Sequence, residues 1–234
     1  MMAFDGCRSL KEVTIPEGVT KIATCTFNQC VSLTKVVLPS KLTSIANMAF
    51  NYCSSLNEIN LPQSLKFIGA NAFAGCSSMT TIILPEGITE IANGLFISCV
   101  SLVHIEIPIN VTSIKSDAFK YCKSLTNINI PQGVSKIAER TFYGCSSLKE
   151  MEIPQWITDI EAEAFSKCKE LQVVRIRDGV RHIGEEAFSN CIRIGSVVIP
   201  VGVTEIGKCA FEDCASLESV VIPDSAKSIG SYAF

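Results

Sequence analysis

The chain has 234 residues, of which 47% are apolar and 18% are charged, a composition that excludes a disordered tail or linker. Its 20 basic residues are outnumbered by 23 acidic ones, which argues against a phosphate-neutralising face for nucleic acid. No apolar run approaches the ~20 residues that span a bilayer, and the N-terminal residues lack the basic and apolar regions of a signal peptide. We therefore expect a folded chain without a signal peptide or a membrane-spanning segment.

An internal period organises the whole chain. Phenylalanine recurs every 23 residues from Phe4 to Phe234, without an insertion or a deletion. Cysteine holds the fifth position and isoleucine the twentieth position of all ten complete units. We predict a single domain, 1–234, whose repeats start at Ala3, Thr26, Ala49, Ala72, Leu95, Ala118, Thr141, Ala164, Ala187 and Ala210, with a truncated repeat at Ala233.

Each unit predicts a helical turn, a strand and a second extended piece, in that order. Ala, Phe and Cys at positions one, two and five have helical spacing, which indicates a short helical turn. In the L-x-x-V-x-I stretch that follows, Val13 and Ile15 point inward and the intervening residues point outward. Proline at position fourteen ends the strand in nine units, because it lacks the N–H that a ladder needs; the tenth unit has Arg177. The V-T-x-I segment is the second extended piece.

One unit alone cannot bury so many apolar positions, but stacked units can. Strands of successive units would then pair in parallel, with equivalent residues ~4.8 Å apart. The sequence therefore predicts a solenoid with a parallel β-sheet face, short helical turns and about ten coils.

The full unit, with A-F-x-x-C-x-S-L and I-P-x-G-V-T-x-I, closely resembles the BspA-like class of leucine-rich repeats. The resemblance covers essentially the whole chain and implies an α/β, right-handed leucine-rich-repeat solenoid. That class is known from surface proteins of bacteria and of some parasitic protozoa, where it is associated with adhesion and binding of host proteins. The resemblance thus implies a cell-surface or secreted protein-binding module. The alternative is an intracellular scaffold for protein–protein interaction, with a cytoplasmic location.

Both ends of the sequence stop inside the repeat pattern, without the polar caps that solenoids need for solubility. We therefore interpret the chain as a segment of a longer array. Two uncapped ends also make end-to-end self-association an expectation.

Ten of the twelve cysteines follow the repeat and stand 23 residues apart. Zinc sites need closer pairs, and disulfides need Cβ vectors that converge, whereas side chains in register point the same way. We expect a buried ladder of reduced thiols that behave as small hydrophobes. Cys25 and Cys209 lie outside the ladder, and we expect them to be partly exposed residues of the helical turn.

Catalytic signatures are not found in the sequence: it has no Gly-rich phosphate loop, no H-E-x-x-H and no G-x-S-x-G. Carboxylate pairs such as Glu150 and Glu152 are typical of solvated surfaces. Serine at position seven is interpreted as a cap or turn residue. We expect no enzyme, no cofactor and no metal.

If the regular positions build the scaffold, recognition belongs to the positions that vary. The outward strand positions, ten and twelve of each unit, are polar and acidic at the centre of the chain and apolar toward its C-terminal end, at Val173, Val198 and Val221. The alternative is an ordinary solvated sheet. The candidate partner-binding residues on this face are His104, Glu106, Asn127, Asn129, Glu150, Glu152 and Arg175.

Trp156, the only tryptophan, stands where five other units have a turn glycine. It is either an exposed interface anchor or a cover for the neighbouring coil, and we include it among the candidate residues. Asn110-Val111-Thr112 matches a glycosylation acceptor sequence.

Overall fold

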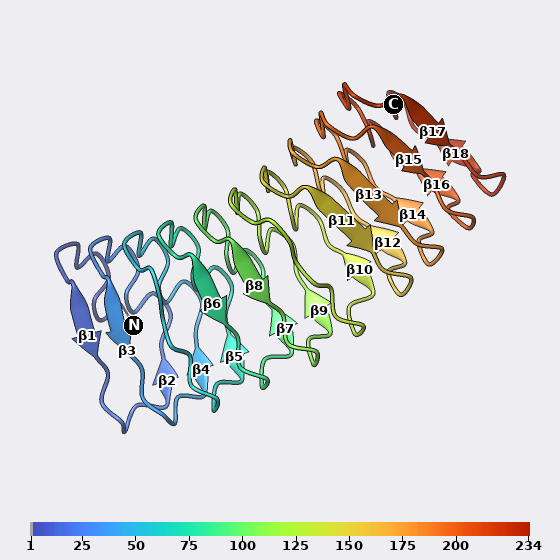
Figure 1. Cartoon of the computed structure of the whole chain (residues 1–234). Helices are drawn as coiled ribbons and strands as arrows, with labels where there is room; N and C mark the ends of the chain where they lie inside the picture. Colours follow the sequence, from blue (N-terminus) through green and yellow to red (C-terminus); the bar gives the residue numbers. More distant parts are fainter. Residues whose placement is uncertain (1) are drawn as a thin grey trace.

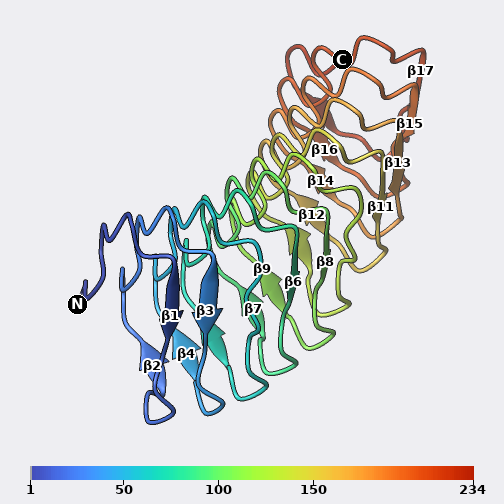
Figure 2. The same cartoon turned by 60° about the vertical axis from the view of Figure 1, so that its left-hand side comes forward.

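The computed structural model describes residues 2–234, which form a solenoid of parallel strands with the two termini at opposite ends (Figures 1 and 2). One row holds the longer strands, which carry the outward face predicted from the sequence and which we call the strand face. These strands are β1 (Glu12–Thr14), β3 (Lys35–Val37), β6 (Thr81–Ile83), β8 (His104–Glu106), β11 (Glu150–Ile153), β13 (Val173–Ile176), β15 (Ser196–Val198) and β17 (Ser219–Val221).

A second row holds the two-residue strands of the V-T-x-I segments. It contains β2 (Lys21–Ile22), β4 (Ser44–Ile45), β5 (Phe67–Ile68), β7 (Glu90–Ile91), β9 (Ser113–Ile114), β10 (Lys136–Ile137), β12 (Asp159–Ile160), β14 (His182–Ile183), β16 (Glu205–Ile206) and β18 (Ser228–Ile229). All pairing is parallel, and partners stand one repeat apart, as in Val13↔Val36 and Ile160↔Ile183. The predicted parallel register is therefore confirmed.

A continuous stack of phenylalanine rings runs through the core. Neighbouring rings lie nearly parallel, with centroids 5.6 Å apart for Phe96 and Phe119 and 5.1 Å apart for Phe165 and Phe188. Phe119 is fully buried, and the isoleucines of both rows and the cysteines pack around the stack. Each coil thus completes the apolar core of its neighbours, which is why one unit alone would not be stable.

The prediction of a short helical turn is wrong, because the described residues contain no helix. The A-F-x-x-C segment instead forms successive turns, in which Cys30 N donates to Phe27 O at 3.2 Å. Left-handed residues occur just before the segment and within it, as at Cys25 (φ 55°) and Gln29 (φ 58°), and each stops a right-handed helix from propagating. Phe27 N and Gln29 N donate across to Ala49 O and Asn51 O of the next coil, so they are not free to make helical bonds.

The number of coils is also lower than expected. The described chain makes nine full turns between β1 and β17, so the solenoid has about nine parallel coils and the prediction of ten is not supported. The units that contain residues 58–60 and 127–129 contribute no strand to the strand face. Asn60, Asn127 and Asn129 lie in these gaps, and asparagine is unfavourable in strands because its amide competes for backbone hydrogen bonds.

The cysteine ladder forms, with one difference at its start. All twelve cysteines are unpaired; Cys7 is exposed, and the other nine ladder thiols are buried. Cys25 and Cys209 are also buried rather than partly exposed, because they occupy left-handed turn positions instead of the predicted helical surface. None of the described residues forms a helix that could cross a membrane.

Candidate functional site

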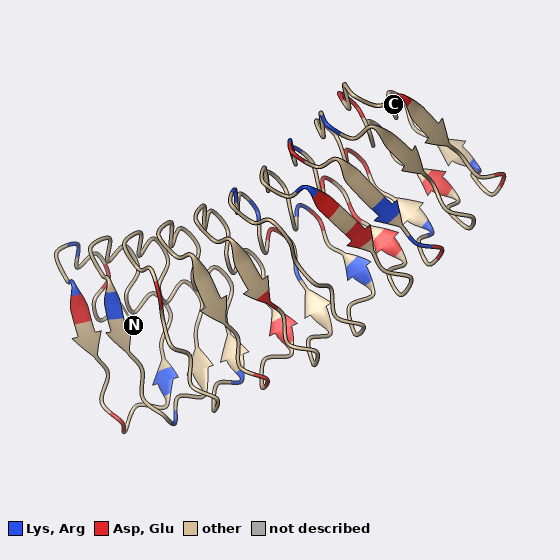
Figure 3. Cartoon of the chain, viewed as in Figure 1, with Lys and Arg blue, Asp and Glu red and all other residues tan. Residues whose placement is uncertain are grey.

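The candidate residues lie on the strand face around β8, β11 and β13. These strands alternate between buried and accessible positions, so Ile105 and Met151 enter the core while Glu106, Glu150 and Glu152 are exposed. Figure 3 shows the acidic residues of β11 beside a basic residue of β13. The structure therefore brings most of the candidate residues onto adjacent coils of one surface.

His104 and two asparagines join the strand-face segments of two coils. The Nδ1 atom of His104 lies 2.9 Å from Oδ1 of Asn127, and its Nε2 atom lies 3.8 Å from Oε1 of Glu106. The Asn129 side chain accepts a hydrogen bond from Ile107 N and donates one to Ile107 O, both at 3.2 Å. This amide thus replaces the ladder bonds that a strand at residues 127–129 would have made.

Two ion pairs reduce the acidic character predicted for the centre of the face. Arg175 Nη1 lies 3.3 Å from Oε2 of Glu150, and Arg177 Nη2 lies 2.9 Å from Oε1 of Glu152. These side chains are exposed, so each pair contributes about 0–1 kcal/mol to stability. Of the three glutamates, only Glu106 has no lysine or arginine partner among the described residues; its neighbour is the imidazole of His104.

Arg177 belongs to this surface, although sequence reasoning did not select it. Its Nε and Nη2 atoms both donate to the same carboxylate oxygen of Glu152, at 3.0 and 2.9 Å. The signal was present in the sequence, because Arg177 replaces the proline that ends the strand in the other nine units. A residue that breaks the repeat pattern can therefore indicate the candidate surface as well as the variable strand positions do.

Three adjacent grooves follow one another along this part of the face. The first, about 470 Å³, lies between His104 and Asn129. The second, about 770 Å³, reaches from Asn127 to Asp178, and the third, about 330 Å³, from Gln172 to Val198. Neighbouring grooves share lining residues, Asn127 and Asn129 for the first two and Arg177 for the last two, and we call the three grooves together the furrow.

Trp156 lines the central groove and is partly buried against the core. Its Nε1 atom is buried and has no hydrogen-bond acceptor. On the neighbouring coil, a Cβ atom at Gly179 would collide with the carbonyl oxygen of Gln155. The tryptophan turn therefore lies close against the next coil, and the indole borders the groove without projecting as a free anchor.

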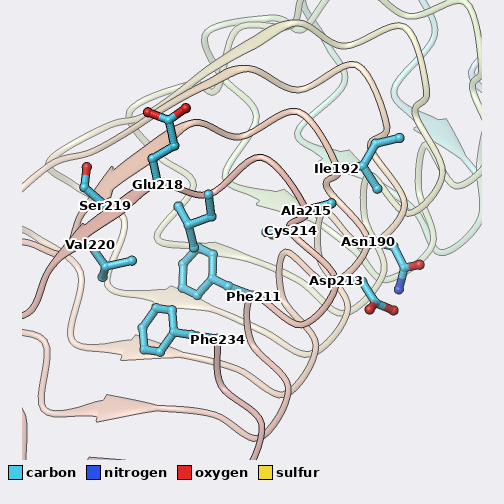
Figure 4. Close-up of a pocket in the computed structure, with 11 residues that line it drawn as sticks. Asn190, Ile192, Phe211, Asp213, Cys214, Ala215, Glu218, Ser219, Val220 and Phe234 are labelled. Carbon is cyan, nitrogen blue, oxygen red and sulfur yellow. The ribbon is translucent and has the colours of Figure 1, made fainter.

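A further groove of about 600 Å³ lies near the C-terminal end, between Phe234, Phe211 and the last strand-face residues (Figure 4). Figure 4 shows the rings of Phe211 and Phe234 beside each other, with Val220 to their left and Glu218 above them. Since both rings belong to the core stack, this groove opens onto the core and lies outside the furrow of candidate residues.

Within residues 2–234, no group of three or more His, Cys, Asp or Glu side chains is placed to hold a metal ion. The buried cysteines of the ladder form hydrogen bonds with the backbone. Each buried ladder thiol donates to a phenylalanine carbonyl of the preceding coil, as Cys122 Sγ does to Phe96 O at 3.1 Å. Burial raises the pKa of these thiols, to about 12 at Cys99.

Solved leucine-rich-repeat proteins of bacteria have a similar fold. One from Bacteroides ovatus is 26% identical over 97% of this chain and 76% of its own, with a TM-score of 0.57. A leucine-rich cell surface protein from Faecalibacterium prausnitzii is 28% identical over 93% of this chain and 74% of its own, with a TM-score of 0.55. A leucine-rich repeat protein of T. pallidum is 34% identical over 62% and 68%, with a TM-score of 0.58.

No curated protein matches the chain. The family model described as BspA type Leucine rich repeat region (6 copies) matches residues 1–126 and 112–234. The two matches together span the chain, in agreement with the unbroken repeat and with the parallel coils. The chain is therefore a member of the BspA-type leucine-rich-repeat family.

Proposed function

We propose that this protein is a non-enzymatic scaffold that binds a partner protein through its strand face, in the furrow from His104 to Val198. The observation that carries the proposal is the furrow itself: three adjacent grooves lined by exposed imidazole, amide, carboxylate and guanidinium groups. A polar surface with aliphatic side chains beside it, here Val198, is typical of protein-binding patches.

The proposed setting is the cell surface or the extracellular space, with a host or partner protein as ligand. One support is that a solved relative, the Faecalibacterium prausnitzii protein, is described as a cell surface protein. The second candidate is an intracellular scaffold of the same architecture. It is favoured by the unpaired state of all twelve cysteines, since disulfides form in oxidising compartments.

Parallel pull-downs with extracellular host proteins and with cell lysate test the proposal. A triple charge reversal, E106K/E150K/E152K, should weaken capture of the bound protein at least tenfold without loss of the fold. Because Arg175 and Arg177 would then face lysines, the face changes from mixed to strongly basic. Circular dichroism and the urea midpoint check that the variant is folded.

Charge reversal at an exposed glutamate outside the furrow, Glu12→Lys on β1, provides the matched control. The control should bind like the wild type. If the triple variant captures the partner as strongly as the control does, the furrow is not the binding surface. End-to-end self-association stays a separate prediction, which sedimentation of the isolated chain over a range of concentrations tests.

A further inference from the structure

The strand face is interrupted between residues 127–130 and β11. No backbone hydrogen bond joins residues 126–131 to residues 149–153 in the described chain. The same two coils are joined elsewhere: Lys136 pairs with Asp159 in the second row, and Tyr121 N donates to Tyr143 O at 2.8 Å in the turns. The coils therefore separate only on the strand face, where the central groove of about 770 Å³ lies between them.

Asparagine side chains account for the opening. Asn129 makes both of its hydrogen bonds to the backbone of Ile107, and Asn127 lies 2.9 Å from the imidazole of His104. Both contacts hold the segment against the coil that precedes it. The segment consequently has no ladder with β11, and the opening is built into the sequence at these two positions.

β11 keeps an unpaired edge toward the groove. On its other side, Val173 N donates to Lys149 O and Arg177 N donates to Ile153 O. Alternate residues of a strand direct their backbone groups to opposite neighbours, so the N–H and C=O groups of Glu150 and Glu152 face the groove. Such an edge is a template for another strand.

The walls of the groove suit a polypeptide. The side-chain amides of Asn127 and Gln155 line it, and Trp156 contributes an apolar wall and a buried indole N–H without an acceptor. Glu150 and Glu152 are neutralised by arginines, so the groove does not select strongly for charge.

From these observations we infer that the cleft between residues 127–130 and β11 binds an extended segment of a partner polypeptide, which adds as a strand to the free edge of β11. This inference rests on the proposed function and specifies the chemistry of its partner. Main-chain hydrogen bonds to Glu150 and Glu152 supply the affinity, and the amide and indole walls select the side chains.

The test uses a variant that closes the cleft without touching β11. N127T/N129I installs the residues of β6, Thr81 and Ile83, at the equivalent positions, which favour a regular strand. A phage-displayed library of random dodecapeptides is selected on the whole wild-type chain. The expected result is a set of peptides that bind the wild type and lose at least tenfold in affinity for N127T/N129I.

Asn60→Ile provides a matched control, because Asn60 lies in the other strand-face gap, away from this groove. It should bind the selected peptides like the wild type. N-methylation along a selected peptide should abolish binding at alternate residues only, and the bound peptide should slow hydrogen exchange at the amides of Glu150 and Glu152.

Three results would overturn the inference: no peptide that prefers the wild type over the closed variant, an N-methyl scan without alternation, or binding only of soluble glycans on an array. Failure of the proposed function is distinguishable from these. Suppose that a captured protein no longer binds E106K/E150K/E152K but binds N127T/N129I normally. The proposed function then stands, and only the inference that the cleft binds a strand is rejected.

Discussion

The thiol of Cys99 donates a hydrogen bond to the carbonyl oxygen of Phe73, 3.1 Å away on the preceding coil. The same oxygen also accepts the backbone N–H of Cys76 at 3.2 Å, so the thiol completes the second acceptor position of a buried carbonyl. The relationship repeats along the ladder from Cys30 to Cys214. The repeated cysteine is therefore a specific donor between coils as well as a small apolar group.

Thiol reactivity should separate Cys7 from the buried cysteines. Cys7 is exposed, whereas the eleven others are buried. With a thiol reagent such as Ellman's reagent at pH 8, the native chain should show one fast thiol, and the remaining eleven should react only after urea is added. Cys7→Ser should remove the fast phase. A native chain in which the ladder cysteines are joined by disulfides would contradict the ladder.

Stability should decrease at alkaline pH. Burial raises the pKa of the thiols of Cys53 and Cys99 from 9.0 to about 12. An unfolded chain loses these protons near pH 9, while the folded chain keeps them. The stabilisation is therefore complete below about pH 9 and is lost progressively as the pH rises toward 12.

Urea unfolding at pH 8, 9 and 10 measures this loss, which amounts to up to about 1.4 kcal/mol per pH unit for each thiol. Cys99→Ala tests the assignment to thiols. In this variant the free energy of unfolding should fall less steeply with pH, by the equivalent of about one proton. At pH 7 the variant should be less stable by about 1–2 kcal/mol, because it loses a hydrogen bond and core packing. An unchanged slope in this variant would assign the alkaline loss to other groups.

Core truncation in the middle of the array should be far more costly than at its end. Phe119 is fully buried between Phe96 and Phe142, with centroid separations of 5.6 and 5.7 Å. We expect Phe119→Ala to lower the free energy of unfolding by about 3–5 kcal/mol, and Ile114→Ala, also in the core, by about 2–5 kcal/mol. Urea denaturation measures both changes.

Phe4→Ala is the matched control for this series. Phe4 has 40% of its surface exposed and stacks on a single ring, that of Phe27. Phe4→Ala should lower the free energy of unfolding by no more than about half as much as Phe119→Ala does, because Phe4 buries less apolar area. Equal losses at both positions would mean that the array does not stack ring on ring.

Gly144 is required by both its conformation and its neighbour. Its φ is +70°, and a Cβ atom there would lie 2.7 Å from the ring of Tyr121. Gly144→Ala should therefore destabilise the chain by about 1–2 kcal/mol for the left-handed backbone, plus the cost of displacing the ring. Thermal or urea unfolding measures the change.

Two further variants separate these contributions. Adding Tyr121→Ala to Gly144→Ala should restore the stability that was lost through the collision with the ring. The stability lost through the left-handed backbone should remain lost. Gly195→Ala should be within about 0.5 kcal/mol of the wild type, because Gly195 has no atom within 4 Å of its Cβ position and no positive φ. A neutral Gly144→Ala would be inconsistent with this packing.

Much of the fold could be predicted from the sequence, because stacking places equivalent residues of successive repeats in the same contacts. Phe27, Ile45 and Cys53 recur at fixed positions, so the period alone determined the parallel register, the ring stack and the buried ladder. The helical turn was predicted wrongly. The apolar spacing of Ala, Phe and Cys suits a helix, but the bonds that Phe27 N and Gln29 N make to the next coil outweigh helical bonds, and a single unit does not contain those partners.

For the candidate site, the sequence alone determined which residues face outward on the strands, since alternation is a local property of the backbone. Only the tertiary structure decided how they meet: Glu150 with Arg175, Glu152 with Arg177, and Asn129 with the backbone of Ile107. It also decided where the coils separate. Each of these contacts joins neighbouring coils whose side chains vary independently, so the repeat pattern carries no information about them, and only their positions in space determine which of them interact.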